Sequence, residues 1–223
     1  MRLNIAMDGP VGAGKSTIAD AVAKRLGILH LDTGAMYRAL GLTALRRKTD
    51  LQDEDACVSL CNTLNVTVAI EDGVQHTFVD GEDVTGLIRT PEVSMAASTI
   101  SRYADVRRAM VAIQQKLASD TDMLLDGRDI CATVLPAAPV KIYLTASAEE
   151  RARRRWLEMR EKGMPDTYEQ VLTEVIRRDE QDMNRPVEPL RKTEDAVEVD
   201  TTEMNFEQVV ETILRIVEEK YHG

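Results

Sequence analysis

The segment GPVGAGKST, residues 9–17, constrains the fold of this chain more than any other feature. It matches the phosphate-binding loop pattern G-x-x-x-x-G-K-[S/T] at every required position. Glycine adopts backbone conformations that a Cβ atom forbids, so successive N–H groups of such a loop can turn inward around an anion. The residues predicted to bind the phosphates of a nucleotide are Gly9, Pro10, Val11, Gly12, Ala13, Gly14, Lys15, Ser16 and Thr17.

The residues on either side of the loop supply the context that the motif needs. The apolar run LNIAM has the length of a buried strand, and Ile18, Val22 and Leu26 recur at helical spacing. A helix that begins at the loop adds the partial positive charge of its N-terminus. Lys15 then supplies a charge for the β- and γ-phosphates, and the Ser16 hydroxyl can bind Mg²⁺. With these flanks, a glycine-rich turn that binds nothing is the weaker interpretation.

The net charge of −10 limits the kind of partner. Nucleic acids and anionic membranes bind cationic proteins, because attraction to phosphate makes the largest contribution in both cases. We therefore expect no nucleic acid and no membrane among the partners, and any basic site must be local. No apolar run reaches the length of a membrane span, and a phosphate loop that begins at residue 9 leaves no room for a signal peptide. We expect a cytoplasmic protein and a monomer.

The order of predicted strands and helices indicates an α/β fold. The predicted strands are LNIAMD, ILHLD, DMLLD, VKIYLTA and AVEVD, separated by segments of helical periodicity. Strands that alternate with helices imply a parallel sheet with helices on both faces. Residues 66–84 depart from this order, because apolar residues alternate on both sides of the turn EDG. This alternation predicts a β-hairpin in a small inserted lobe.

A phosphate-binding loop is compatible with three classes of protein: a phosphotransferase, a GTP-dependent switch, and an ATP-driven motor or nucleic-acid enzyme. The base-reading motif N-K-x-D of a switch is absent from the sequence. The segment DVTG, residues 83–86, imitates the switch motif D-x-x-G, but it lies beside the hairpin rather than after a buried parallel strand. A motor would bring a larger chain and a basic track. These comparisons favour a phosphotransferase.

A phosphotransferase whose two substrates both carry phosphate needs arginines near the carboxyl ends of its strands, because the two anions repel each other. Arg38 follows the second predicted strand, on the first turns of a helix. Arg128 follows the strand DMLLD directly. Either arginine alone could be part of a surface salt bridge, so the prediction rests on their recurrence at strand ends.

The helix predicted before Pro186 places two carboxylates on the line of its apolar stripe. The stripe consists of Tyr168, Leu172, Val175 and Ile176. It continues into Asp179 and Asp182, which need compensating charge near a helix C-terminus. Arg178 and Arg185 are within reach, so one interpretation is a structural cluster of ion pairs. The other is a site in which Arg185 faces phosphate and Asp182 faces a hydroxyl.

The segment ERARRRWLEMREKG, residues 150–163, is the one dense basic run. Its three glutamates and the acidic net charge of the chain favour an exposed amphipathic helix over a nucleic-acid site. The same residues fit a lid that closes over ATP, with Arg151, Arg154 or Arg155 touching the transferred phosphates. We predict the lid within about residues 150–164.

Together these segments resemble the bacterial cytidylate kinases, the CMP kinases of the nucleoside monophosphate kinase group. The likeness includes DGPVGAGKST, LDTGAMYRA, GEDVTGLIRTPEVSMAAS, VRRAM, DGRDI, APVKIYLTAS, RDEQDMNRPVEPL and VDTT. It implies a P-loop kinase fold with a five-stranded parallel sheet and a small antiparallel insert. The implied division is a core of residues 1–32 and 86–223, and a monophosphate-binding lobe of residues 33–100 with the hairpin at about 65–85.

The resemblance also implies roles for individual residues. The arginines that grip phosphate correspond to Arg38, Arg128 and Arg185, and the catalytic group also includes Lys15, Arg154 and Arg155. The base is expected to bind at Ser98, Arg107 and Asp129, the ribose at Asp182, and the same pocket is lined by Thr33 and Tyr37. Asp126 and Ser16 are the residues expected near Mg²⁺. One departure is Cys131 with Ala132, where relatives usually have glycine and threonine.

The activity that the resemblance implies is transfer of the γ-phosphate of ATP to CMP, and to dCMP, with Mg²⁺ as the second cofactor. Such a transfer needs in-line positioning and dispersal of charge, but no general base, because the acceptor phosphate is already ionised. Another nucleoside monophosphate or small-molecule kinase of the same fold is the nearest alternative. A nucleotide-dependent binding protein without kinase activity is the alternative from another class.

Overall fold

The computed structural model describes residues 2–71 and 74–221. The chain divides into two compact units, Met1–Ile28 with Leu124–Gly223, and Leu29–Met123. The elements of the first unit are β1 (Asn4–Asp8), α1 (Lys15–Leu26), β6 (Met123–Gly127), the short π-helical turn η1 (Ile130–Val134), β7 (Val140–Thr145), α6 (Ala148–Glu161), α7 (Tyr168–Asn184), β8 (Val197–Asp200) and α8 (Phe206–Tyr221). The predicted division into a core and a monophosphate-binding lobe concerns function and stays a prediction.

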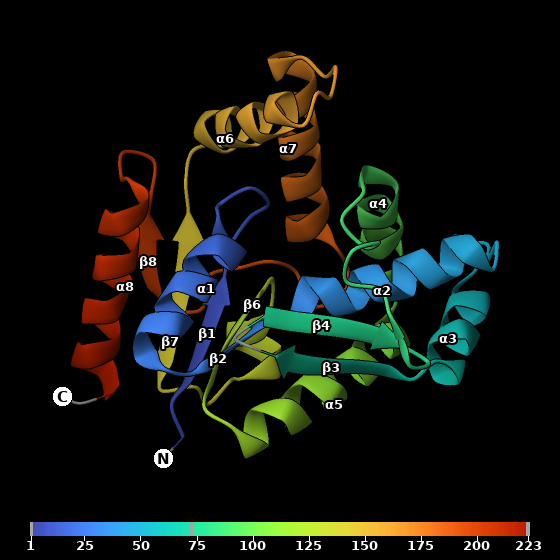
Figure 1. The fold of residues 1–223 in the computed structure, drawn as a ribbon, viewed down its shortest axis with the longest axis horizontal. Coiled ribbons are helices and arrows are strands. Elements are labelled where there is room, and N and C mark those ends of the chain that lie inside the picture. Colours follow the sequence, from blue (N-terminus) through green and yellow to red (C-terminus); the bar gives the residue numbers. More distant parts are fainter. Residues whose placement is uncertain (1, 72–73, 222–223) are drawn as a thin grey trace. The chain divides into compact units, whose positions relative to one another are not determined.

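The sheet of five strands has the order β2-β6-β1-β7-β8, where β2 spans Leu29–Asp32. Strand β1 pairs with β7 in parallel, and β7 pairs with β8 in parallel (Figure 1). The five predicted strands are confirmed, and their observed bounds differ from the predicted ones by at most one residue. The predicted α/β fold class with a parallel sheet of five strands is therefore confirmed.

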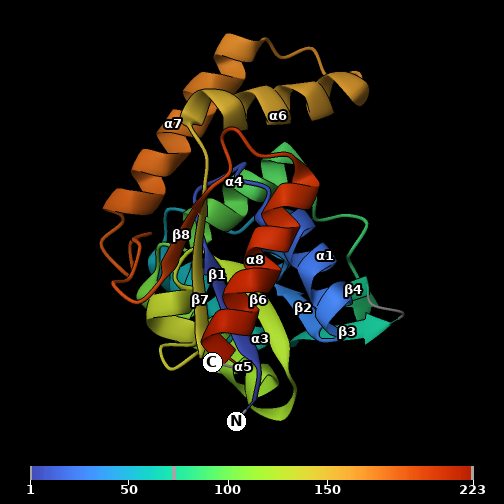
Figure 2. The same ribbon diagram turned by 90° about the vertical axis from the view of Figure 1, so that its left-hand side faces the viewer.

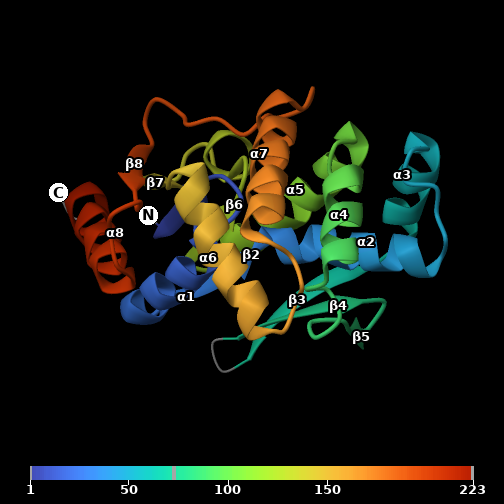
Figure 3. The ribbon, with the colours of Figure 1, turned by 90° about the horizontal axis from the view of Figure 1, so that it is seen from above.

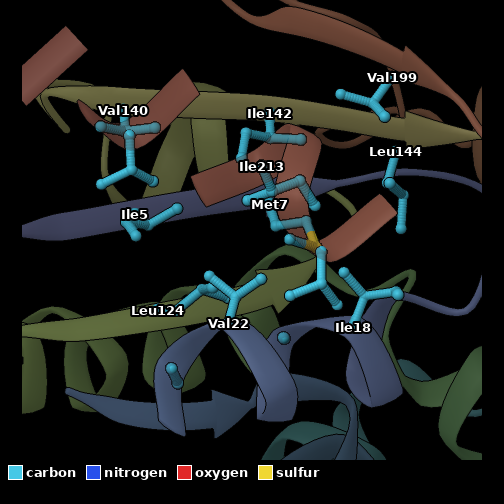
Figure 4. Close-up of a cluster of buried hydrophobic side chains, with 14 of the residues drawn as sticks. Ile5, Met7, Ile18, Val22, Leu124, Val140, Ile142, Leu144, Val199 and Ile213 are labelled. Carbon is cyan, nitrogen blue, oxygen red and sulfur yellow. The ribbon is translucent and has the colours of Figure 1, made fainter. Parts of the chain in front are cut away.

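An apolar layer fills the first unit between the sheet and two helices (Figure 4). Helices α1 and α8 contact each other, and each also contacts a strand. The buried side chains include Ile5 and Met7 of β1, Ile18 and Val22 of α1, Ile142 and Leu144 of β7, Val199 of β8 and Ile213 of α8. This burial explains why the central strands β1 and β6 are apolar runs, whereas the edge strand β8, with the sequence VEVD, alternates. The layer fixes the end of β1, where the phosphate loop begins.

Helices α6 and α7 pack against each other around a small core of their own (Figure 2). Trp156 of the basic run lies in this core beside Tyr168, with ring centroids 6.3 Å apart. The basic run is therefore one side of an amphipathic helix, as predicted. The stripe predicted on α7 is wrong in one position, because Ile176 is 42% exposed while Val171 is buried. The side of α7 that meets α6 is thus rotated from the predicted one.

The second unit contains β2, a three-stranded antiparallel sheet and four helices. Its remaining elements are α2 (Thr33–Arg46), α3 (Glu54–Thr63), β3 (Val66–Glu71), β4 (Val74–Val79), β5 (Glu82–Asp83), α4 (Pro91–Ile100) and α5 (Ala104–Asp120). The predicted hairpin is confirmed, and β5 adds a third short strand. Residues 72–73 of its turn lie outside the described residues. The segment DVTG forms a local turn, since Asp83 Oδ1 accepts the backbone N–H of Thr85 at 2.9 Å.

Helices α2 and α4 cross each other and approach closely (Figure 3). A Cβ atom added to Gly41 would lie 2.8 Å from the backbone nitrogen of Ala97, so a larger residue would force the helices apart. Asp32 caps the first turn of α2 by accepting the N–H of Ala35 at 2.9 Å. This packing holds the N-terminal turns of α2, where three predicted site residues lie, namely Thr33, Tyr37 and Arg38.

The three cysteines are free and buried. Cys57 and Cys61 lie on α3 in the second unit, and Cys131 lies in η1 in the first. Burial raises the pKa of all three thiols. The Sγ of Cys131 lies 3.5 Å from the carbonyl oxygen of Ala6. At this position, where a glycine was expected from the resemblance, the chain therefore places a thiol against β1. Among the described residues, no helix is long and apolar enough to cross a membrane.

Candidate active site

The loop between β1 and α1 has the geometry of an anion-binding turn. Gly12 and Gly14 have φ angles of 74° and 84°, which favour glycine. A Cβ atom on Gly9 would lie 1.9 Å from the carbonyl oxygen of Leu144, so the loop passes β7 only with glycine there. No side-chain hydrogen bond caps the N-terminus of α1. The first N–H groups of α1 can therefore turn toward a phosphate.

Lys15 lies at the start of α1 and is 6% exposed. Its Nζ donates to the carbonyl oxygens of Gly9 and Pro10, both at 2.8 Å. Burial, followed by repulsion from Arg128, lowers the pKa of Lys15 to about 7. A phosphate inside the loop would supply the countercharge that this ammonium group needs.

Ser16 and Asp126 form the part of the site that fits Mg²⁺. The Ser16 hydroxyl donates to Asp126 Oδ2 at 3.0 Å, which brings α1 and the end of β6 together. Both are oxygen ligands of the kind that Mg²⁺ takes alongside water and substrate phosphates. In the described part of the chain, no three His, Cys, Asp or Glu side chains could hold a metal ion together. The residues present therefore fit an ion that binds together with a nucleotide.

Arg128 directly follows β6 and lies in the same charged cluster as Lys15. Its Nε donates to Asp182 Oδ2 of α7 at 2.8 Å. Burial raises the pKa of Asp182. The attraction and hydrogen bond of Arg128, together with the attraction of Arg178 and Arg185, outweigh burial, so that the pKa is lowered overall. Asp182 therefore stays ionised and orients the Arg128 guanidinium.

Arg178, one turn before Asp182 on α7, is a cation that the sequence pattern identified only as a possible ion-pair partner. Its Nε is buried without a hydrogen-bond acceptor. Burial, followed by repulsion from Arg128, lowers the pKa of Arg178 to about 10. Arg128 thus repels both Arg178 and the buried Lys15, and the three cations form a concentration of positive charge suited to an anion. The spacing of Arg178 and Asp182 on one side of α7 is the signal that could have identified it.

Asp129 and Arg185 form a second ion pair in the first unit. Their closest atoms, Oδ1 and Nη2, lie 3.3 Å apart, and each side chain is 8% exposed. One interpretation of the sequence placed Asp179 and Asp182 in a cluster of ion pairs with Arg178 and Arg185. Attraction from these two arginines does help to lower the pKa of Asp182, but the closest partners of the two aspartates are others. Asp182 pairs with Arg128, and Asp179 pairs with Arg151 of α6 at 2.6 Å. The partners come from other elements, whose proximity the local spacing on α7 did not reveal.

The arginines of the predicted lid make their contacts within the first unit. Arg151 is 5% exposed and also donates to the carbonyl oxygen of Val11 at 2.8 Å. Arg154 donates to the carbonyl oxygen of Thr201 at 2.7 Å and pairs with Glu150. Arg155 lies 3.6 Å from Glu174. Arg151 thus links the phosphate loop to α6 and α7, whereas Arg154 links α6 to the segment after β8.

In the second unit, Arg38 lies on the second turn of α2. Its Nη2 donates to Asp32 Oδ2 at 2.6 Å, and Arg89 reaches the same oxygen at 3.2 Å. The Nε of Arg38 is buried without a hydrogen-bond acceptor. One carboxylate with two arginines leaves a net positive charge, as the prediction of a phosphate contact at Arg38 requires.

The residues of the second unit that are predicted to bind the base or to line its pocket lie on three helices. Arg107 of α5 is 2% exposed and donates to the carbonyl oxygen of Ser101 at 3.1 Å. Its guanidinium carbon lies 5.7 Å from the ring centroid of Tyr37 on α2. Ser98 lies one turn before Ser101, whose hydroxyl donates to the Ser98 carbonyl oxygen. Thr33, the first residue of α2, is buried. Tyr37 and Arg107 are thus brought into direct contact.

The comparison with protein families now identifies the chain's relatives. A family model described as cytidylate kinase matches residues 5–219. The chain belongs to the cytidylate kinase family. Relatives named cytidylate kinase from Caldicellulosiruptor bescii and from Geobacillus sp. (strain WCH70) are each 48% identical, over 96% and 98% of this chain and 95% and 97% of theirs. A third, from Enterococcus faecalis, is 44% identical over 98% of this chain and 97% of its own.

Solved structures support the fold of this cytidylate kinase family member. A shikimate kinase from Bacteroides thetaiotaomicron superposes with a TM-score of 0.50 at 11% identity, covering 98% of both chains. A gluconokinase from Sinorhizobium meliloti 1021 gives a TM-score of 0.50 at 14% identity, covering 98% of this chain and 94% of that one. At these identities the likeness concerns the fold alone. The resemblance inferred from the motifs is confirmed by the family match.

Proposed function

We propose that this chain transfers the γ-phosphate of ATP to CMP, and to dCMP, giving ADP and CDP or dCDP. The observation that carries the proposal is the concentration of buried cations around Lys15 in a cytidylate kinase family member. Arg128 lies close enough to Lys15 and to Arg178 to lower the pKa of each. A cluster of this kind matches the charge of two phosphate groups that must approach each other.

The donor is proposed to bind along the phosphate loop. The N–H groups of the loop and of the first turn of α1 hold its phosphates, and Lys15 turns from the loop carbonyls to the β- and γ-phosphates. A cavity of about 680 Å³ in the first unit, lined by Ser147, Arg153, Tyr168, Thr202, Met204 and their neighbours, is proposed for the donor nucleoside. Its volume lies within the range typical of ligand pockets.

The acceptor is proposed to bind through the residues that the resemblance implies. Arg38, Arg128 and Arg185 bind its phosphate, Asp182 its ribose, and Ser98, Arg107 and Asp129 its base, while Thr33 and Tyr37 line the pocket. Cytosine offers an amino donor at N4 beside the acceptors N3 and O2. A carboxylate and an arginine complement that pattern, whereas uracil reverses it at positions 3 and 4.

The chain's own residues supply the chemistry of transfer. The arginines and Lys15 disperse the charge on the equatorial oxygens as the phosphoryl group passes between the nucleotides. Arg154 and Arg155 are proposed to join them after exchanging their contacts with Thr201 and Glu174 for phosphate. Mg²⁺, held by Ser16 and through water by Asp126, would neutralise phosphate charge when bound. No side chain needs to act as a general base.

An ADP-release assay over CMP, dCMP, UMP, AMP and GMP tests the proposed function. We expect kcat/KM to be highest for the cytidine monophosphates. Preference for another monophosphate would favour another nucleotide kinase of this fold. Slow ATP hydrolysis that no monophosphate stimulates would favour a nucleotide-dependent binding protein and contradict the proposal.

Replacement of Asp129 by alanine tests its proposed contact with the base. We expect the transition state for CMP to lose about 1–3 kcal/mol of stabilisation, measured as a lower kcat/KM, because the N4 amino group loses its acceptor. UMP gains little from this carboxylate and should lose less, so the CMP/UMP ratio of kcat/KM is the quantity to measure at saturating ATP. Asp55→Ala, an exposed carboxylate on α3, is the control and should leave the ratio unchanged. An equal loss of kcat/KM for CMP and UMP would contradict a role of Asp129 in base recognition.

Binding of ATP should be accompanied by proton uptake. The pKa of Lys15, lowered to about 7 by burial and then by Arg128, places it largely in the neutral form at pH 8. Phosphate binding restores the charged form, so about one proton should be taken up per ATP at pH 8. Calorimetry in buffers of different ionisation enthalpy measures this number. Lys15→Met should abolish the uptake, and equal uptake by wild type and variant would contradict the assignment.

A further inference from the structure

A helical turn begins directly after two proposed substrate-binding residues, Arg128 and Asp129. This turn, η1, has Asp129 at its N-cap position, and the carbonyl oxygen of Asp129 accepts the N–H of Thr133 at 2.9 Å. The first N–H groups of any helical turn have no acceptor within it. The orientation of Asp129 therefore depends on what satisfies the N–H groups of Ile130 and Cys131.

The side chain of Asp129 does not cap its own turn. Aspartate is among the residues preferred at N-cap positions, because its carboxylate accepts the free N–H groups. Two other aspartates in this chain do so: Asp32 caps α2 through Ala35, and Asp53 caps α3 through Ala56. The Asp129 carboxylate instead pairs with Arg185.

Asp8 satisfies these N–H groups from a different element. Its Oδ1 accepts the N–H of Ile130 and its Oδ2 accepts the N–H of Cys131, both at 2.8 Å. Asp8 is the last residue of β1, 122 positions before Ile130, and is 1% exposed. Both oxygens of one carboxylate of β1 thus cap a turn that has an aspartate at its own N-cap position.

The carboxylate of Asp8 is held in a place that disfavours its charge. Burial raises the pKa of Asp8 to about 6, and repulsion from Asp129 also raises it. The hydrogen bonds from the N–H groups of Cys131 and Ile130 act in the opposite direction and lower it. Since this pKa is above the ordinary value of 3.8, the ionised form is disfavoured in the folded state, and this cost to stability is fully present above pH 6. Lys15 and Arg128 face the same carboxylate and offset part of the cost. Stability alone does not account for a carboxylate at this position.

We propose that Asp8 is a positioning residue for base recognition. By capping η1 in place of Asp129, it leaves the Asp129 carboxylate turned toward Arg185 and the nucleobase. This inference rests on the proposed function, in which Asp129 contacts the cytosine. Asp8 also joins the end of β1, where the phosphate loop starts, to the residues that bind the acceptor.

Replacement of Asp8 by asparagine removes one acceptor without changing the shape of the side chain. The amide group of asparagine then faces one of the two N–H groups, and Asp129 can turn back to cap its own turn. We expect the CMP/UMP ratio of kcat/KM to fall by about tenfold, while KM for ATP stays within about twofold of wild type. Asp53→Asn, which alters a helix cap on α3 away from the proposed site, should leave the ratio unchanged.

A double-mutant cycle separates positioning from a general structural effect. If Asp8 acts through Asp129, then Asp8→Asn should leave the CMP/UMP ratio unchanged in the Asp129→Ala background. A structural role would instead lower kcat/KM for both substrates equally, or lower the ratio by the same factor in both backgrounds. Either of these results would overturn the assignment.

A folding control and the wild type complete the test. We expect Asp8→Asn to fold, as judged by thermal unfolding, because it removes a disfavoured buried charge. If it does not fold, Asp8→Glu, which keeps the charge but shifts both oxygens, should lower the ratio, and an unchanged ratio would overturn the assignment. If the wild type prefers CMP and the Asp8 variant has the same CMP/UMP ratio, the role of Asp8 is contradicted while the proposed function stands. A wild type that neither phosphorylates CMP nor binds it in preference to UMP would overturn the proposed function, and this assignment with it.

Discussion

Replacement of Lys15 by alanine is expected to lower kcat by about 10³-fold while CMP affinity stays within about twofold of wild type. The expected loss is large because the Lys15 ammonium acts on charge that develops during transfer, in a buried site where water cannot replace it. CMP binding should persist because Lys15 is proposed to contact only the donor phosphates. Turnover assays and calorimetry with CMP alone measure the two quantities.

Lys24→Ala is the matched control, because Lys24 lies on the same helix with its side chain exposed. It should retain wild-type turnover. A fall in CMP affinity as large as the fall in rate for Lys15→Ala would place Lys15 at the acceptor rather than at the donor.

Replacement of Arg128 by methionine is expected to affect both activity and stability. It removes a proposed phosphate contact, so kcat/KM for CMP should fall by about 10²- to 10³-fold. It also leaves the buried carboxylate of Asp182 without its ion-pair partner. The free energy of unfolding should therefore fall by about 3 kcal/mol at pH 7.

The pH dependence of this stability loss follows from the sign of the Asp182 shift. Arg128 keeps the pKa of Asp182 below its ordinary value, so the pair stabilises the fold above that value and the contribution is lost as the pH falls through the lowered pKa. Wild type and Arg128→Met should thus converge in stability toward acid pH. Arg108→Met, in an exposed pair with Asp105, should cost at most about 1 kcal/mol. An Arg128 variant with wild-type stability at pH 7 would contradict the importance of this pair.

Local patterns in the sequence were sufficient to predict the sheet and the phosphate loop. The central strands β1 and β6 are apolar runs because they are almost fully buried, and such a run can be recognised without knowing which strands lie beside it. Gly9 and Gly14 are fixed by backbone geometry that only glycine satisfies easily. The hairpin was visible for the same reason, since alternation along β3 and β4 is a local property.

The partners of the charged residues could not be predicted in this way. The spacing on α7 suggested Arg178 and Arg185 as partners of the two aspartates, whereas the ion pairs join α7 to Arg128 and Arg151. Such contacts depend on how elements far apart in sequence pack together. The cap that Asp8 provides was invisible for the same reason, because only the proximity of β1 and η1 gives it meaning. The burial of Val171 rather than Ile176 on α7 likewise depends on where α6 lies.

Because all three thiols are buried, the native cysteines can serve as chemical probes of local unfolding. Only the thiolate reacts readily with alkylating reagents, so each cysteine should be labelled only when its surroundings unfold. Cys57 and Cys61 lie in one compact unit and Cys131 in the other. Mass spectrometry of briefly alkylated protein would therefore show, without any added probe, whether the two units open together or one before the other.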